Sequence, residues 1–440
     1  MGFYRSFRDA FLSKYGLEVY YVVLIVAVFL LGWLPGNPAE AGLFSSFFFA
    51  LMPFVLAVLL VKVFWSTWLE YQFQKSYWST EYFVVEVRLP DEVTKTPFAA
   101  ELFMRSLYDV GEVDTQFDTW LRGKTKPWYS LEIISTEGVV KFYVWGRRRY
   151  KTLIESQLYA HYPNVQVIEV PDYTLKVPYD PAVMDIWGIE QKLQMPDPYP
   201  ITTYVEMKLD KAEVEEEFKH DPLISILEFF GTMKEGEHAW LQIIMRAHTE
   251  CSWAEEDPEI GHEVEIREWV QHEVERITKR VTDENGRVNA AALTEGEKDM
   301  IAAMQRKPGK QMFDVGMRAV YLSRKDKTDG NKRTGFPTTF RSFEHGSEGR
   351  GNGLKPIFVL GPFFYPWQDF MGMRRALLKR KLYDGYVQRQ YFYPPFKHRH
   401  IALNVEEIAS VWHFPGRVAR TPALERMTSR RGEAPSNLPT

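Results

Sequence analysis

The residues best suited to binding chemistry lie near the C-terminal end, from Arg374 to Arg399. Cationic side chains stand there against a single acid, Asp384, with aromatic residues interleaved. The cations are Arg374, Arg375, Lys379, Arg380, Lys381, Arg389, Lys397 and Arg399. Because cations neutralise phosphates and aromatic rings stack on bases, this basic-aromatic segment predicts contact with single-stranded nucleic acid. Contact with anionic lipid and a plain solvated surface are the alternative interpretations.

Other groups that chemistry would use lack suitable partners. His262-Glu263 and His272-Glu273 are ten residues apart, which places them about 80 degrees apart around a helix, unlike the histidine pair of a zinc peptidase. His398-Arg399-His400 is interpreted as the polar edge of a strand, with metal or anion binding as the alternative. Cys251, the single cysteine, is interpreted as a buried structural residue. The sequence therefore predicts no catalytic residue, no metal and no cofactor.

The segment "RGKTKP", residues 122–127, ends like a phosphate-binding loop. That motif needs a glycine five positions before Gly123, so that backbone N–H groups can surround the phosphates, and Asp118 occupies the position. Lys124 is therefore expected to be an ordinary loop lysine, and this chain is not expected to hydrolyse ATP by that route.

Composition limits the class of protein. With 440 residues, of which 45% are hydrophobic and 25% charged, the chain can form two or three globular domains. A net charge of -4 excludes coating of nucleic acid by bulk charge. A single cysteine excludes an intrachain disulfide and suits a reducing compartment.

Two apolar runs predict a transmembrane helical hairpin over residues 17–65. No residue is charged from Val19 to Ala39, and a second uncharged run extends from Ala41 to Val61. Basic residues flank the pair of runs, whereas the connection between them has none, so both ends are expected to face the cytoplasm. The alternative is a secretory signal cleaved at Ala39-Glu40-Ala41, which would leave the second span in place.

The body reads as one α+β arrangement used twice. After a cytoplasmic N-terminus (1–16), the hairpin and a juxtamembrane linker (66–80), residues 81–178 show the order β-α-β-β-α-β of a ferredoxin-like module. Residues 83–89 alternate as a strand, a helix is expected from about 96 to 110, and Glu137-Gly138 marks a hairpin turn.

A second ferredoxin-like module is predicted over residues 200–415, beginning with a strand at 202–210. Asp221-Pro222 opens its first helix, and a helical insertion is expected at about 250–311, where Thr294 and Glu297 form a capping box. A mobile loop is expected at about 324–356, and Asn404 opens the last helix. Residues 416–440 are expected to form a flexible tail.

Several stretches together resemble a known group of proteins. The two-span start, "YKTLIESQLYAHYPNVQVIEVPDYT" and, most specifically, residues 403–439 resemble the N-terminal, non-ATPase region of membrane-anchored proteins of type IV secretion and conjugative DNA transfer. In many of these proteins the "HFPG" helix end and the "APSNLP" tail precede a coupling-type ATPase domain.

This resemblance implies a non-enzymatic anchoring and assembly component of the inner membrane, with a separate Walker-motif ATPase as partner and an oligomeric assembly around it. It also implies a multi-pass protein whose N- and C-termini are cytoplasmic. The alternative function is that of a membrane-anchored, single-stranded nucleic-acid-binding protein acting through the basic-aromatic segment.

Overall fold

A computed structural model describes residues 38–90, 93, 95–109, 111, 115–211, 221–249, 252–253, 263–281, 292–344, 352–361, 363, 369–416 and 424–427. The first predicted membrane span, His262 and Cys251 lie outside these residues, apart from the last two positions of that span.

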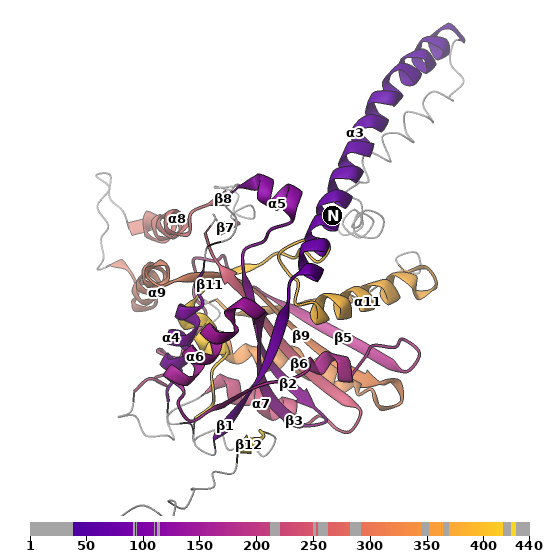
Figure 1. Ribbon diagram of the computed structural model, residues 1–440. Helices are drawn as coiled ribbons and strands as arrows, with labels where there is room; N and C mark the ends of the chain where they lie inside the picture. Colours follow the sequence, from indigo (N-terminus) through magenta and orange to yellow (C-terminus); the bar gives the residue numbers. More distant parts are fainter. Residues whose placement is uncertain are drawn as a thin grey trace, which may run out of the picture.

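Within the described residues, one long helix, α3 (Pro38–Ser79), precedes the body and projects from it (Figure 1). Its portion from Leu51 to Ser79 is long and apolar enough to cross a membrane, and its most apolar stretch is not buried against the protein. The helix continues through residues 66–79, so the segment predicted as the juxtamembrane linker is helical over these residues. No proline or glycine interrupts this stretch, and its aromatic side chains pack on the body, which favours continued helix.

Ten strands form one sheet within the described part of the chain. They are β1 (Tyr82–Pro90), β2 (Trp128–Thr136), β3 (Val139–Arg147), β4 (Gln166–Glu169), β5 (Met184–Leu193), β6 (Glu237–Ala247), β9 (Met312–Arg324), β10 (Leu354–Phe358), β11 (Ile401–Asn404) and β12 (Arg426–Met427). Two short strands, β7 (Ser252–Trp253) and β8 (Glu263–Val264), pair separately.

The helices of the body fall between these strands. They are α4 (Phe98–Ser106), α5 (Gln116–Arg122), α6 (Lys151–His161), α7 (Pro222–Gly231), α8 (Ile266–Thr278), α9 (Glu295–Arg306), α10 (Gly330–Thr338), α11 (Met373–Val387) and α12 (Val405–Val411). The α+β class and the helical insertion, α8 with α9, are as predicted, and the predicted capping boxes open α9 and α12.

The strand order repeats within the sheet. The first half runs β4-β1-β3-β2 and the second β10-β5-β9-β6, with neighbours antiparallel. Strands β2 and β6 join the halves through an antiparallel ladder from Trp128↔Arg246 to Thr136↔His238. The halves therefore share one sheet rather than forming two separate units.

The second half of the sheet does not begin where it was predicted to begin. Its first strand is β5, which lies between the predicted modules, whereas residues 202–210 are largely turns. The predicted strand fails because Lys208 has a φ of 58 degrees and Tyr204 is buried with its hydroxyl bonded to Glu101 of α4. A left-handed residue interrupts an extended strand.

Two segments predicted to be mobile are partly ordered. Within 324–356, α10 and a short helix at Thr339–Phe343 bury Phe336, Phe340 and Phe343 completely. Within the predicted tail, Leu424 bridges to β3 and β12 pairs in parallel with β1. In both segments a few apolar side chains supply the burial that the polar composition seemed to exclude.

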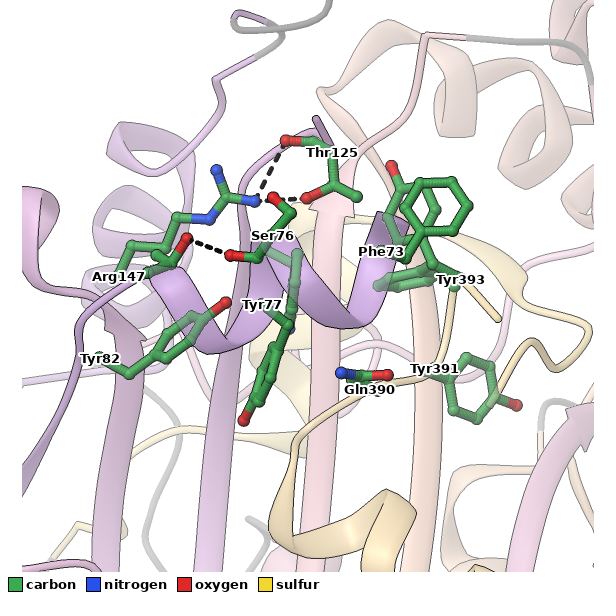
Figure 2. A pocket seen from close by; sticks show the side chains of 12 residues that line it. Phe73, Ser76, Tyr77, Tyr82, Thr125, Arg147, Gln390, Tyr391 and Tyr393 are labelled. Atoms are coloured by element: carbon green, nitrogen blue, oxygen red, sulfur yellow. Dashed lines mark hydrogen bonds between the residues drawn. The ribbon is translucent and has the colours of Figure 1, made fainter. Parts of the chain in front are cut away.

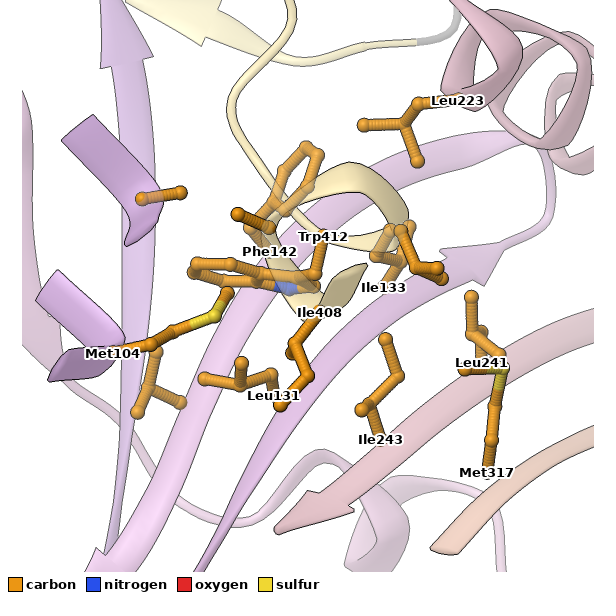
Figure 3. Packing of buried hydrophobic residues seen from close by; sticks show 14 of the residues in the cluster. Met104, Leu131, Ile133, Phe142, Leu223, Leu241, Ile243, Met317, Ile408 and Trp412 are labelled. Carbon is orange, nitrogen blue, oxygen red and sulfur yellow. The ribbon is translucent and has the colours of Figure 1, made fainter. Parts of the chain in front are cut away.

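The two faces of the sheet are covered differently. One face packs on α4, α6, α7 and α12 in an apolar core, drawn in Figure 3. Figure 3 shows Ile408 of α12 and Trp412, which directly follows this helix, among Leu131, Ile133 and Phe142 of the sheet. The other face is covered by α11 and the segments around it, with a core rich in tyrosine and tryptophan.

Candidate functional site

The C-terminal part of α3 is fixed to the body by α5 and the loop after it. The indole Nε1 of Trp68 donates to the backbone oxygen of Trp120 over 3.0 Å, and the rings of Trp65 and Trp120 meet edge to face at 5.6 Å. Gly123 has a φ of 64 degrees, and a Cβ there would lie 2.2 Å from the backbone oxygen of Gln72. Only glycine allows this approach between the loop and α3.

Closer to the C-terminal end of α3, a set of aromatic rings joins this helix to the sheet. This aromatic joint consists of Phe73, Tyr77, Tyr82, Trp128, Trp145 and Tyr393 (Figure 2 shows the surrounding pocket). Phe73 lies 5.1 Å from Tyr393 between ring centroids, Tyr77 stacks on Tyr82 at 4.8 Å, and Tyr82 stacks on Trp145 at 4.5 Å. The chain of rings runs from α3 into β1 and β3.

Arg147 closes the aromatic joint at its polar side. Its guanidinium lies 5.1 Å from the Trp128 ring and donates to the hydroxyl and carbonyl oxygens of Thr125 over 2.6 and 3.1 Å (Figure 2). The remaining space is about 20 Å³, room for a single water molecule. The aromatic joint is therefore a packed contact between α3 and the sheet rather than a ligand pocket.

The C-terminal segment also takes part in this contact. The amide nitrogen of Gln74 on α3 donates to the side-chain oxygen of Gln390 over 2.9 Å, and the hydroxyl of Tyr393 accepts from the backbone N–H of Lys126 over 3.2 Å. Three distant parts of the sequence, α3, the first half of the sheet and residues 390–393, therefore meet where α3 joins the body.

Arg389 of the basic-aromatic segment is buried, and the prediction that it contacts nucleic acid or lipid was wrong. Only 1% of its surface is exposed. Its guanidinium donates to both carboxylate oxygens of Glu132, over 3.0 and 3.3 Å, and to Asp172. Burial opposes the charge, but the two carboxylates raise the pKa of Arg389 well above its ordinary value. The arginine is a structural cation.

The other cations of this segment are dispersed. Lys379 pairs with Asp185, Arg380 with Asp384 over 3.0 Å, and Arg375 with Asp369 over 3.8 Å. Arg374 lies over the ring of Phe363, Lys381 is partly buried on α11, and Lys397 and Arg399 are exposed beyond it.

The interleaved aromatic residues mostly point inward. Tyr383, Tyr386, Tyr391 and Phe392 are buried in the second core, and Tyr393 belongs to the aromatic joint. Stacking on bases requires exposed rings, so this surface does not combine cations with free aromatic faces. The sequence pattern did not reveal that Arg389 is buried, because its partners Glu132 and Asp172 lie far away in the chain.

The two histidines of His398-Arg399-His400 each face an acid. The Nδ1 of His398 lies 3.1 Å from Glu190, and the Nε2 of His400 lies 3.4 Å from Asp314. Asp314 also receives His248 at 2.6 Å and Arg246 at 2.8 Å. Although burial opposes it, the hydrogen bond from His248 and the charges of the other two hold the pKa of Asp314 at about 2.

This polar cluster has the form of an ion network. Burial lowers the pKa of His400 to about 4, so the imidazole is neutral at pH 7. Among the described residues, no group of three His, Cys, Asp or Glu side chains is placed to hold a metal ion. Lys124, at the loop lysine position, lies 3.4 Å from Asp118.

The fold and the joint define an α+β protein in which a long apolar helix packs on a body built around one mainly antiparallel sheet. The chain belongs to the family described as Domain of unknown function (DUF8128), whose model matches residues 70–426. The match begins inside α3, after the apolar run, and ends at β12, so it covers the sheet and both of its covering layers. No curated protein matches the chain.

Proposed function

We propose that this protein is a non-enzymatic anchoring and assembly component of the inner membrane, which holds a rigid cytoplasmic body at a fixed place beneath the bilayer. The observation that carries the proposal is the aromatic joint, because a helix apolar enough to span the membrane is packed without a flexible linker onto the sheet. A tether would need no such packing, whereas a scaffold that transmits position or force does.

The length of the apolar run in α3 sets the proposed distance between the body and the bilayer. The uncharged run Ala41–Val61 is about 30 Å long at 1.5 Å per residue, matching the hydrocarbon thickness. Trp65 follows Lys62 by about 4.5 Å along the axis, at headgroup level, where tryptophan is favoured. Helix α5 contacts Trp65 and leaves Phe117 and Leu121 67% and 56% exposed, which suits an interfacial position.

Each half of the sheet is proposed to be a ferredoxin-like module. Support comes from the repeated strand order and from a helix after the first and third strands of each half. The proposed protein is multi-pass with cytoplasmic N- and C-termini, since Lys62 and the residues before the first run supply the positive flanks.

The proposed partner is a separate Walker-motif ATPase of a type IV secretion or conjugative DNA-transfer machine, within an oligomeric assembly. Support comes from the resemblance of residues 403–439 to the segment that precedes such an ATPase. The segment up to Phe414 is built into the core, where Trp412 and Phe414 pack on Phe142, so an ATPase contact would fall beyond β12.

The membrane part is tested by labelling the full chain in lipid nanodiscs. On a Cys251→Ser background, nitroxides are placed by Leu56→Cys in the apolar run, Phe117→Cys on α5 and Leu175→Cys in the short helix Tyr173–Lys176, where that side chain is exposed. Oxygen should reach the first label best and a polar nickel reagent the third, with Phe117 intermediate. A label at Leu56 as water-accessible as that at Leu175 would refute anchoring.

The partner is tested by affinity purification of the tagged full chain from its native membrane. Deletion should begin at residue 428, because residues 424–427 pair with the sheet. Loss of a co-purified Walker-motif ATPase on deletion supports the split motor. Absence of an ATPase from both samples argues for a scaffold that works without one.

A further inference from the structure

A cavity of about 420 Å³ opens where the sheet divides beside β9. Strand β9 pairs with β5 along Met317–Arg324 and with β11 along Met312–Val315, so two strands occupy the same edge in succession. Gly316 lies at the change, where a Cβ would stand 2.3 Å from the ring of Tyr391. Tyr391 therefore sits at the fork and lines the cavity, whose volume is typical of small-molecule sites.

Two buried polar side chains line this cavity without using their hydrogen-bonding capacity. Gln191 is 2% exposed, and neither atom of its amide has a partner among the described residues. Trp269 is 3% exposed, and its indole Nε1 likewise has none there. Buried polar groups are nearly always paired, so the indole N–H of Trp269 indicates that another molecule completes the site.

A pair of lysines forms one side of the cavity. Lys192 of β5 and Lys355 of β10 are directly opposite each other in the antiparallel ladder, so their side chains share a face with Cβ atoms about 5 Å apart. Within the described chain neither lysine forms an ion pair. Like charges in this register destabilise a sheet, and an anion between them reverses that effect.

The rest of the lining favours the same sign of ligand. Arg276 and Arg399 also line the cavity, with the neutral His400, against the two acids Glu190 and Asp197. Glu190 is occupied by His398, and Arg276 is paired with Glu273 over 2.7 Å. The cationic side of the cavity thus exceeds the acidic side in a chain whose net charge is -4.

We propose that the fork cavity binds a small phosphate- or carboxylate-bearing molecule. Its anionic group lies between Lys192 and Lys355, and its polar remainder accepts from the indole N–H of Trp269. The site is independent of the anchoring function and of the membrane helix.

Thermal unfolding of the detergent-solubilised full chain tests the proposal. The protein is heated in chloride, in inorganic phosphate and in malonate at matched ionic strength. We expect phosphate or malonate to raise the midpoint by about 3 °C, and the responding salt identifies the anion class. The double variant Lys192→Gln/Lys355→Gln should lose this rise while unfolding in chloride no earlier than the wild type. Trp269→Phe, which keeps a ring without the N–H, should reduce the rise.

The matched control is Lys176→Gln, an exposed lysine away from the cavity, which should respond as the wild type does. The proposal is overturned if neither salt stabilises the wild type beyond chloride. It is equally overturned if the double variant responds as strongly as Lys176→Gln does.

Discussion

The two faces of the sheet are both buried, but they are covered by different kinds of contact. On the face covered by α4, α6, α7 and α12, neighbouring strands present apolar residues such as Ile133, Leu241 and Ala319, all fully buried. On the opposite face, the row Glu132, Gln242 and Arg318 crosses the same three strands, and all three side chains are equally buried.

The polar row is held by hydrogen bonds instead of apolar contact. Gln242 donates to Glu132 over 2.9 Å and accepts from Arg318 over 2.7 Å, while Arg389 caps Glu132 from the covering segment. An apolar face tolerates imperfect partners, whereas a buried charge requires its own partner. This difference specifies which segment must cover the second face.

The largest effect should come from removing the cation of the polar face. Arg389→Met leaves the fully buried Glu132 and the half-buried Asp172 without their cation, so stability should fall by about 3–5 kcal/mol. Denaturant unfolding in detergent measures the loss. Adding Glu132→Gln should recover part of it, because one uncompensated charge is removed. Equal losses in the single and double variants would contradict the ion-pair explanation.

A smaller loss is expected from a cavity on the apolar face. Leu241→Ala removes a fully buried side chain and should cost about 2–4 kcal/mol. Leu175→Ala, at a position 73% exposed, is the matched control and should stay within about 0.5 kcal/mol. The same denaturant series reports both, and a loss at Leu175 as large as at Leu241 would show that burial is not the cause.

A pH-dependent effect should separate the faces further. His400 has a pKa of about 4 when folded and about 6.5 when unfolded, so the unfolded chain binds the proton more tightly. Stability should therefore fall, by on the order of 2 kcal/mol, as the pH drops from about 6.5 to about 4, and be unaffected above that window. His400→Gln should flatten this slope in unfolding curves at pH 7, 5.5 and 4.5.

Asp314 acts in the next window down. Its pKa of about 2 lies below the ordinary 3.8, so its stabilising contribution is complete above about pH 4 and is lost as the pH falls toward 2. For the window between pH 6.5 and 4, a slope of stability against pH that is unchanged in the His400→Gln variant would mean that groups other than His400 cause it.

The smallest change should come from the exposed side of α11. Arg375→Gln removes an exposed cation 3.8 Å from Asp369 and should alter stability by less than about 0.5 kcal/mol. Thermal unfolding of this variant and of Arg389→Met compares the stability lost at an exposed and at a buried arginine of the same basic segment. A loss comparable to that of Arg389 would remove the distinction.

Local signals in the sequence predicted those elements whose causes are local. The alternation of residues 83–89, the turn at Glu137-Gly138 and the caps at Asp221, Thr294 and Asn404 each correspond to an observed strand, hairpin or helix start. These features depend on neighbours a few residues away, so one sequence contains them.

The misassigned elements depend on distant partners. The residues around β5 contain no local signal that it pairs with β9 and β10. In the sequence Arg389 cannot be distinguished from its exposed neighbours, because the partners that bury it, Glu132 and Asp172, lie in the first half of the chain. The aromatic joint was missed for the same reason, since Phe73, Tyr82 and Tyr393 lie in three separate segments.

By itself, the sequence determined an apolar run long enough for a membrane, the α+β class and the starts of the principal helices, because hydrophobic length, periodicity and capping are short-range properties. Only the tertiary structure decided that the two halves share one sheet, that α3 packs directly on it, and which cations are buried. Those outcomes rest on strand pairing and charge compensation between residues far apart in the chain, which a linear pattern does not encode.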